Sequence, residues 1–356
     1  MKRFTQSAFW AEFKSHHGWE SCPVSADGVT YSVLVRQLNL KFKKISIAYV
    51  PMAPEVAMDC PEVQLADKLS LIAEQIKKQL PGNTFCIRFD PAMDFEEVTE
   101  RDNYVHNFIH TAGNFIIKKA SANVQPPDTT ILLLKTDQTN ERSEEEILAA
   151  MKSKWRYNIK LAAKKGVTIE KYDYNSAGFN NAFEQFYKLF QQTSDRDGVQ
   201  FHNKEYYRSL FELAATSDSA KEENIKITLY LAKHQDDYLA GIITLFCPAE
   251  AVYLYGASGN IKRNLMPAYL LQWTAIKDAK NYGCPYYDFY GMPPTEDPKH
   301  PMHGLYLFKT GFGGKIIHRP GSFDAVIKKG DYKLYAAAEK LRAFYYKVIV
   351  KKLKHR

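Results

Sequence analysis

The sequence predicts an α/β protein built from two related domains, each with a mixed β-sheet. The chain has 356 residues, which is enough for two domains of ordinary size. Its 45% hydrophobic and 25% charged residues are typical of a globular protein. Strands followed by a helix and one further strand occur in both halves, so the architecture repeats although the sequence does not.

The first half carries this pattern between residues 31 and 90. Paired strands are expected at 31–36 and 44–50, which are rich in β-branched and aromatic residues. A helical pattern over 61–80 ends at Pro81-Gly82, and a buried strand is expected at 84–90. A strand at 129–135 follows Pro126-Pro127. Ser143 and the three glutamates after it then predict a capped helix start, which places the domain boundary near Arg142.

The second half repeats the order. Strands are expected at 226–232, 239–247 and 252–256, a helix at about 266–282 that ends at Gly283, and a strand at 286–290. The four glycines between Gly304 and Lys315 indicate a glycine-rich hairpin. An amphipathic basic helix over 331–353 is expected to pack back on the first domain. The predicted domains are therefore 1–142 plus 317–356, and 143–316.

Composition restricts the location and the chemistry. No apolar run approaches the ~20 residues of a membrane span, and the N-terminus lacks a secretory apolar segment, so a cytoplasmic protein is expected. Five scattered cysteines without a C-x-x-C pair predict neither a disulfide framework nor a zinc site, and Cys86 and Cys284 are expected to be buried. His106 and His110 lack the glutamate of an H-E-x-x-H metal motif. Walker A, Rossmann and G-x-S-x-G motifs are absent as well.

The net charge of +8 is concentrated locally. One basic segment covers 152–165 and another covers 347–356. Such segments attract phosphate from nucleic acid, nucleotides or an anionic membrane surface, although a solvated helix face is the alternative interpretation of each.

The order of elements in the second half matches the acyl-CoA acetyltransferase (GNAT) core. That fold holds the CoA pyrophosphate on backbone N–H groups at a helix N-terminus, in a glycine-containing loop. In this sequence the corresponding stretch is 263–268, where Met266 and Pro267 replace the glycines. Because proline has no N–H, the acyl donor is not expected to be CoA.

Further motifs occur in a fixed order from Thr5 to Gly314. They are Thr5-Gln6-Ser7 with Trp10, Lys14 and Gly18-Trp19; Lys154-Trp155-Arg156 with Asn158-Ile159, Ala162 and Gly166-Val167; Thr193 with Arg196-Asp197-Gly198; Tyr255-Gly256; Pro267-Ala268-Tyr269; Asp288-Phe289-Tyr290-Gly291; and Gly304 with Phe308-Lys309, Gly311-Phe312 and Gly313-Gly314. Together they resemble the FemABX family, the peptidyltransferases that build peptidoglycan interpeptide bridges.

This resemblance implies two tandem GNAT-like domains and a ribosome-independent reaction. The donor would be aminoacyl-tRNA as co-substrate, with no cofactor. The acceptor would be the side-chain amine of the third stem-peptide residue of a nucleotide-linked or lipid-linked peptidoglycan precursor, and glycine, alanine or serine would be transferred. The long helical arm of some members is expected to be absent, since Arg196 is followed closely by the strand near Lys226. A monomer with peripheral contact to the inner membrane surface is expected.

The resemblance also implies roles for individual residues. Lys309 would face the tRNA 3′ end or the developing oxyanion, with Phe308 beside it; a solvated hairpin lysine is the alternative. Asp288 and Asp90, at equivalent strand ends, are candidate bases, although strand-end aspartates are often turn formers. Substrate contacts are expected at Lys14, Thr193, Arg196, Tyr255, Gly311 and Gly313.

Some of these residues have plainer interpretations. Arg196 could instead pair with Asp195 or Asp197, and Tyr255 could belong to the core. Two other functions remain open at this point, an acyl-CoA N-acyltransferase and a non-catalytic module that binds RNA or a membrane surface.

Overall fold

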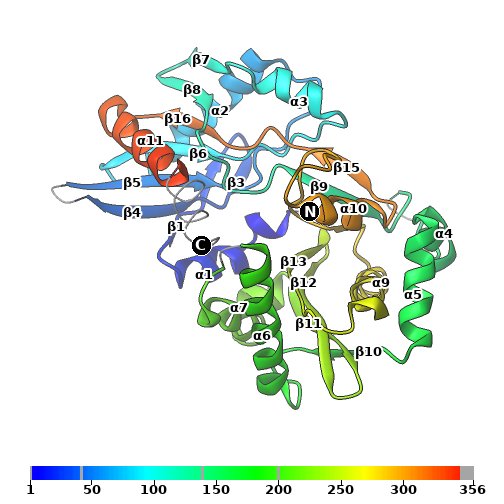
Figure 1. Ribbon diagram of the computed structural model, residues 1–356. Helices are drawn as coiled ribbons and strands as arrows, with labels where there is room; N and C mark the ends of the chain where they lie inside the picture. Colours follow the sequence, from blue (N-terminus) through cyan, green and yellow to red (C-terminus); the bar gives the residue numbers. More distant parts are fainter. Residues whose placement is uncertain (1, 41–42, 138–139, 199–200, 345–356) are drawn as a thin grey trace. The chain divides into compact units, whose positions relative to one another are not determined.

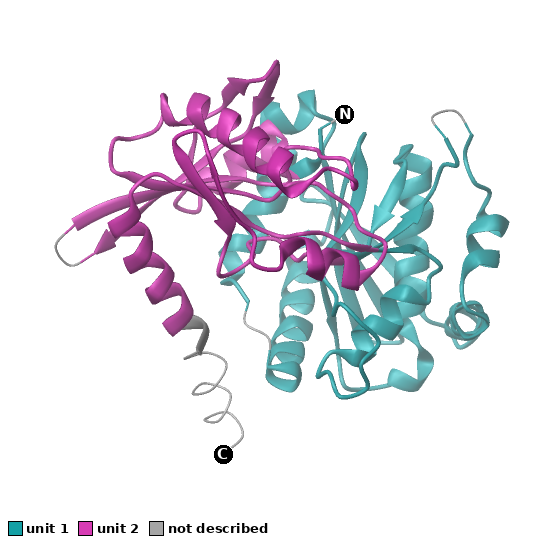
Figure 2. Ribbon diagram, turned by 90° about the horizontal axis from the view of Figure 1, so that it is seen from above, with its two compact units in different colours: residues 1–4, 129–316 teal, residues 5–128, 317–356 magenta. Residues whose placement is uncertain are grey.

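The computed structural model describes residues 2–40, 43–137, 140–198 and 201–344. The chain divides into two compact units (Figure 2): unit 1 comprises Met1–Phe4 and Thr129–Ile316, and unit 2 comprises Thr5–Asp128 and Ile317–Arg356. The predicted boundary near Arg142 is therefore wrong. Strand β9 (Asp128–Leu133) pairs with β14 (Tyr286–Asp288), far along the chain, and so belongs to the second sheet.

Unit 2 contains a mixed sheet with the strand order β1-β4-β5-β6-β16-β8-β7. The parallel pair β5 and β6 is joined by helix α2 (Glu62–Lys77), and the other pairs that are given a register are antiparallel. These strands are β1 (Glu20–Ser21), β4 (Leu34–Leu40), β5 (Lys43–Val50), β6 (Thr84–Phe89), β7 (Ile109–Ala112), β8 (Phe115–Lys119) and β16 (Phe323–Val326).

Helices cover both faces of this sheet. On β5, Ala48 and Val50 share a buried cluster with α2 (Glu62–Lys77), whereas Ile45 and Ile47 share another with Tyr332 of α11 (Lys329–Phe344). Alternate residues of a strand point to opposite faces, which explains the division. The part of the predicted 331–353 helix beyond Phe344 lies outside the described residues. The remaining elements of this part of the chain are η1 (Phe4–Gln6), α1 (Ala8–Ser15), β2 (Val24–Ala26), β3 (Val29–Tyr31) and α3 (Val98–Val105).

Unit 1 contains the second mixed sheet, with the order β10-β11-β12-β13-β14-β9-β15. The parallel pair β13 and β14 is joined by α9 (Pro267–Tyr282), just as α2 joins β5 and β6 in unit 2, so the repeated architecture is present. The predicted buried positions of Cys86 and Cys284 are confirmed. The strands are β10 (Thr168–Tyr172), β11 (Lys226–His234), β12 (Asp237–Cys247), β13 (Glu250–Ser258) and β15 (Lys315–His318), with β9 and β14 as given above.

Helices lie on both sides of the central strands of unit 1 (Figure 1). Ala240 and Ile242 of β12 share a buried cluster with α5 and α9, whereas a Cβ on Gly241 would lie 2.7 Å from Phe186 of α6. The described residues between α6 and β11 form α7 and α8. The helices are α4 (Glu144–Ala150), α5 (Ser153–Lys164), α6 (Phe179–Asp197), α7 (Lys204–Thr216), α8 (Asp218–Glu222), η2 (Arg263–Leu265) and α9 (Pro267–Tyr282).

The predicted glycine-rich hairpin at 304–315 is wrong. Residues His303–Thr310 form helix α10, a short turn follows, and β15 begins at Lys315. Gly304 is the one glycine inside the helix, so the cost in helix propensity is small, and the other three glycines lie in the turn.

Candidate functional site

Lys309 occupies a buried cage at the end of β14. Its side chain is 5% exposed, and Nζ donates hydrogen bonds to the carbonyl oxygens of Phe289 (2.6 Å), Tyr290 (3.2 Å) and Gly291 (2.8 Å). The ring of Tyr253 lies 4.9 Å from the nitrogen. Three donors therefore meet three acceptors, and the interpretation of Lys309 as a solvated surface lysine is wrong.

A left-handed residue makes this cage. Tyr290 has φ of +60°, which turns the chain sharply just after the strand. Asp288 holds the turn, because its Oδ1 accepts hydrogen bonds from the Tyr290 N–H (2.7 Å) and from the Thr129 hydroxyl of β9. The carbonyls after β14 consequently point at Lys309. The geometry gives Asp288 a turn-forming role beside its predicted role as a base.

The cage changes the protonation of Lys309. Burial lowers the pKa of this amine to about 7, and the negative charge of Asp288 partly opposes the shift. An amine with a pKa near 7 can donate or accept a proton at neutral pH, a property suited to acid–base or electrostatic catalysis.

Aromatic side chains line the region next to Lys309. Phe308 is partly buried and contacts Tyr269 of α9, with ring centroids 5.3 Å apart. Its carbonyl oxygen accepts a hydrogen bond from Trp155 Nε1 at 2.9 Å, which joins α10 to α5. Asn158, also from α5, is 2% exposed, and its side chain lies beside the hydroxyl of Tyr269. Sequence reasoning quoted Trp155, Asn158 and Tyr269 within motifs but assigned them no role.

Gly311 and Gly313, for which a contact with substrate stays a prediction, serve close packing in the structure. A Cβ on Gly311 would lie 2.2 Å from the Trp155 ring. Gly313 has φ of +81°, and a Cβ there would lie 2.3 Å from the carbonyl oxygen of Ala150. These glycines allow the turn after α10 to approach α4 and α5.

Thr193 and Arg196 meet at the end of β13. The Thr193 hydroxyl accepts a hydrogen bond from Ser258 N (3.0 Å) and donates to Leu189 O (2.9 Å). Arg196 donates to the carbonyl oxygen of Ser258 (2.9 Å) and makes two 2.8 Å bonds to Asp197. The alternative interpretation of Arg196 as the partner of Asp197 is therefore confirmed. The side chain keeps 25% exposure, so its outer edge faces solvent.

Tyr255 lies between this cluster and the Lys309 cage. Its ring packs against Tyr207 of α7 with centroids 4.9 Å apart. Burial raises the pKa of Tyr255 well above its usual value, and the neighbouring phenols of Tyr206, Tyr207 and Tyr290 add to the shift. Tyr255 is thus a protonated hydroxyl near the turn that holds Lys309.

The other two predicted residues belong to unit 2. Lys14, at the end of α1, is partly buried, and burial together with the charge of Arg36 lowers its pKa to about 8. Arg36 in turn lies over the Trp19 ring at 5.6 Å. Two neighbouring cations suit an anionic group. Sequence reasoning missed Arg36, because the residue is brought to Lys14 by the pairing of strands and not by a motif.

Asp90 repeats the arrangement of Asp288. It follows β6 and accepts hydrogen bonds from the hydroxyls of Tyr49 and Ser322, and Ser322 directly precedes the neighbouring antiparallel strand β16. Burial raises the pKa of Asp90, although these hydrogen bonds oppose the shift. Each unit thus carries a buried strand-end carboxylate bound to a hydroxyl from the adjacent strand.

Two further surveys cover residues 2–40, 43–137, 140–198 and 201–344. Within these ranges no group of three or more histidine, cysteine, aspartate or glutamate side chains could hold a metal ion. No helix of the same part of the chain is long and apolar enough to cross a membrane.

Comparison with known proteins points in one direction. A model of the FemAB family matches residues 1–216 and 211–340. The lipid II:glycine glycyltransferases of Staphylococcus aureus strains COL and USA300 are each 22% identical over 391 aligned positions, covering 91% of this chain and 88% of the relative. The crystal structure of FemX superimposes with a TM-score of 0.69 at 20% identity and covers 94% of both chains. This likeness confirms the predicted fold class.

Proposed function

This chain belongs to the FemAB family, and on that premise we propose that it is an aminoacyltransferase of peptidoglycan bridge synthesis. It would transfer glycine, alanine or serine from aminoacyl-tRNA to the side-chain amine of the third stem-peptide residue of a precursor. The observation that carries this proposal is the similarity to lipid II:glycine glycyltransferases over 91% of the chain. Glycine and a lipid-linked acceptor are therefore the first choices to test.

The proposed reaction is the attack of an amine on an ester. The acceptor nitrogen forms a bond to the aminoacyl carbonyl carbon, the bond from that carbon to the tRNA oxygen breaks, and the tRNA leaves with a free hydroxyl. The acceptor nitrogen loses one proton. Since the ester is already activated, positioning of the two substrates can supply several kcal/mol of the barrier, of order 7–11 at best.

Lys309 would act next to the reacting carbonyl. Its three hydrogen bonds hold the turn at residues 289–291, and its charge would stabilise the oxyanion of the tetrahedral intermediate. Asp288 would keep the turn in place, and Phe308 would line the donor side.

The N-terminus of α9 supports tRNA over CoA as the donor. Met266 has φ of +55° and Pro267 begins the helix, so the first turn lacks one N–H group. A helix start of this kind is a poor pyrophosphate site. We propose that the reaction needs no cofactor besides the co-substrate.

The exposed face of α5 supports binding to a polyanion. Lys154, Lys160 and Lys164 are exposed, and Tyr157 between them keeps 63% of its surface exposed. Cations beside a solvent-facing ring suit RNA phosphates and bases. We also propose contact with the inner membrane surface; the basic segment 347–356 lies outside the described residues. We also propose a monomer, which light scattering of the purified protein tests.

A transfer assay tests the function directly. The protein is mixed with glycyl-, alanyl- or seryl-tRNA and with either a lipid-linked or a nucleotide-linked precursor, and the product is identified by mass. We expect the mass of one amino acid on the diamino residue, and loss of transfer with retained precursor binding in Lys309→Ala. Lys221→Ala is the matched control, since Lys221 is exposed and pairs only with Asp218 in the ion pairs of the described chain.

Two results would contradict the proposal. Transfer from acetyl-CoA in the absence of tRNA would favour an acyl-CoA N-acyltransferase. Binding of tRNA or vesicles without transfer from any of the three aminoacyl-tRNAs would favour a non-catalytic binding module.

A further inference from the structure

Helix α11 of unit 2 exposes an apolar strip. Leu334 is 56% exposed and Leu341 is 69% exposed. Seven residues of a helix turn by about 700°, so these two side chains lie on one face of α11, two turns apart. Ala337 and Ala338, which come between them in the sequence, are exposed as well. Leucines that face solvent in this arrangement indicate a surface that contacts something outside the chain.

The opposite face of α11 already packs on the sheet of unit 2 (Figure 1). Tyr332 is 5% exposed and shares a buried cluster with Phe85 of β6. The ring of Tyr335 also packs against Phe85, with centroids 4.9 Å apart. Two residues of a helix turn by about 200°, so Leu334 points away from the side that Tyr332 occupies. The two leucines therefore do not attach α11 to the sheet.

A column of lysines runs beside the leucines. Lys333 and Lys340 each precede a leucine by one residue, which places them about 100° from it around the helix. Lys329 continues this column by one turn toward the start of α11. All three lysines are exposed, and within the part of the chain that the structure describes none of them forms an ion pair. The apolar strip thus has a positive border.

The two carboxylates of α11 are engaged within the protein. Asp331 pairs with Lys43 of β5 at 2.7 Å. Glu339 pairs with Arg88 of β6 at 2.8 Å. Because both negative charges are directed at cations of the sheet, the charge that α11 presents to solvent is positive.

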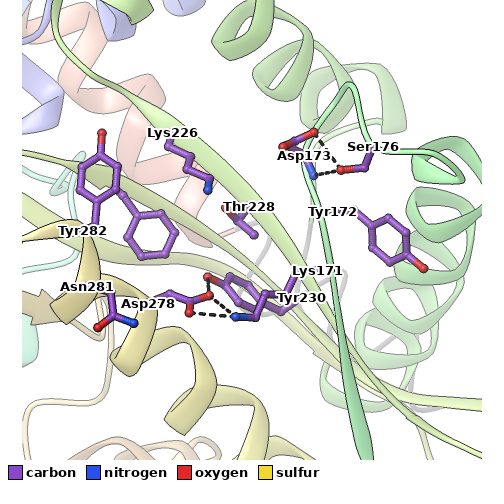
Figure 3. A pocket seen from close by; sticks show the side chains of 11 residues that line it. Lys171, Tyr172, Asp173, Ser176, Lys226, Thr228, Tyr230, Asp278, Asn281 and Tyr282 are labelled. Atoms are coloured by element: carbon purple, nitrogen blue, oxygen red, sulfur yellow. Dashed lines mark hydrogen bonds and ion pairs between the residues drawn. The ribbon is translucent and has the colours of Figure 1, made fainter. Parts of the chain in front are cut away.

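The cavity of unit 1 carries a different pattern of charge. Its volume is about 370 Å³, and Figure 3 shows the side chains that line it. Lys171 donates a 2.8 Å hydrogen bond to Asp278 there, and Asp173 adds a further carboxylate to the wall. Both signs of charge occur side by side in that wall, whereas the outward-facing charges of α11 are cations.

We propose that the outer face of α11, which comprises Lys329, Lys333, Leu334, Lys340 and Leu341, binds the surface of an anionic lipid membrane. The leucines would insert among the acyl chains, and the lysines would bind the lipid phosphates. The choice of a membrane as the partner rests on the proposed function, because a lipid-linked acceptor is held in one. An RNA would bind the lysines but would leave both leucines in water.

Sedimentation of the full-length protein with lipid vesicles tests the proposal, in the absence of tRNA and precursor. One set of vesicles contains phosphatidylglycerol and phosphatidylcholine in equal parts, and the other contains phosphatidylcholine alone. We expect binding to the anionic vesicles, with a partition constant at least about tenfold above that for the neutral vesicles. Binding to the anionic vesicles should weaken at high salt, because salt screens the lysines.

Two double variants separate the apolar and the charged contributions. Leu334→Gln with Leu341→Gln should lower the partition constant at least about tenfold, because two apolar side chains no longer leave water. Lys333→Gln with Lys340→Gln should lower it about tenfold on anionic vesicles and leave it unchanged on neutral ones. Glutamine favours the helix about as well as the residues that it replaces, and circular dichroism and the melting temperature verify the fold.

Matched controls come from other exposed positions. Val63 and Leu71 of α2 are 58% and 70% exposed, with the exposed Asp67 between them. Val63→Gln with Leu71→Gln therefore removes a comparable apolar area from a face that lacks the lysine column. Lys221→Gln with Lys226→Gln removes two charges from exposed positions of unit 1. Neither control pair should change the partition constant.

The other outcomes contradict the proposal. Absence of binding to anionic vesicles, or equal binding by the wild type and both α11 variants, would overturn it. Weaker RNA binding by the lysine variant, with unchanged vesicle binding, would assign this face to RNA. The conversion of a dimer to a monomer by the leucine variant, again with unchanged vesicle binding, would assign it to a second copy of the chain. Transfer to a lipid-linked acceptor without vesicle binding would remove the membrane surface alone, and a failed transfer assay leaves the vesicle result unaffected.

Discussion

Three glycine-to-alanine variants of unit 1 separate the cost of backbone strain from the cost of close packing. Gly283 has φ of +88°, and no described atom beyond its chain neighbours lies within 4 Å of a Cβ placed there. Gly311 has φ of −71°, but its Cβ would lie 2.2 Å from the Trp155 ring. Gly313 combines φ of +81° with a Cβ 2.3 Å from the carbonyl oxygen of Ala150.

The three costs follow from these environments. Gly283→Ala introduces only left-handed strain, about 1–2 kcal/mol. Gly311→Ala introduces only overpacking, about 3 kcal/mol and thus the upper end of the usual range, because the Trp155 ring is buried and held by its hydrogen bond to Phe308. Gly313→Ala introduces both, and a backbone carbonyl shifts less readily than a ring, so we expect a loss of about 3–5 kcal/mol in the free energy of unfolding.

Urea unfolding followed by tryptophan fluorescence measures these losses. Hydrogen exchange of peptides from residues 144–164 and 303–318 assigns them to unit 1, because the two units can unfold separately. The packing explanation would be refuted by a Gly313→Ala variant whose free energy of unfolding equals or exceeds that of Gly283→Ala. A raised KM at unchanged stability would instead support the predicted contact of Gly313 with substrate.

Three further perturbations test the ionised groups. Urea unfolding of the wild type and of Lys309→Met at a series of pH values tests the lowered pKa of Lys309. The wild-type free energy of unfolding should rise, relative to that of the variant, between about pH 7 and 10.5, because the unfolded lysine, with a pKa of 10.5, binds more protons there than the folded lysine, with a pKa of about 7. A parallel pH dependence in both proteins would show that the pKa of Lys309 is not lowered. Arg88→Met should cost unit 2 about 3–5 kcal/mol, because it leaves Asp324, which is 0% exposed, without its 2.7 Å partner. Lys43→Met, which breaks an exposed pair with Asp331, is its control and should cost under about 1 kcal/mol in the same denaturation assay. Arg196→Ala should raise the Kd for the precursor at least about tenfold in a direct binding titration at a temperature where the variant is folded. An unchanged Kd would remove Arg196 from the acceptor site.

Local patterns predicted most of the individual elements. Runs of β-branched and aromatic residues marked β5, β6, β11, β12 and β13, and apolar spacing with terminal signals marked α2 and α9. Ser143 indeed caps α4, and Glu146 returns the hydrogen bond, because a capping box involves only four consecutive residues. Where the signal was local, the prediction was correct within a few residues.

Glycine content misled the prediction around Lys309. The glycines at 311, 313 and 314 suggested a hairpin, whereas they serve the approach of the turn to α4 and α5. A glycine that is required for packing against a distant segment has the same appearance in a sequence as one that is required for a turn.

The sequence by itself therefore determined the two α/β units, their strands and helices, and the motifs that identify the family. Only the tertiary structure decided that β9 joins the second sheet, that Arg36 lies beside Lys14, and that Lys309 is buried in a cage of three carbonyls. The cage depends on the left-handed turn at Tyr290 and on Thr129, which reaches Asp288 from another strand. Contacts of this kind depend on the pairing and packing of distant segments, and no local sequence pattern encodes them.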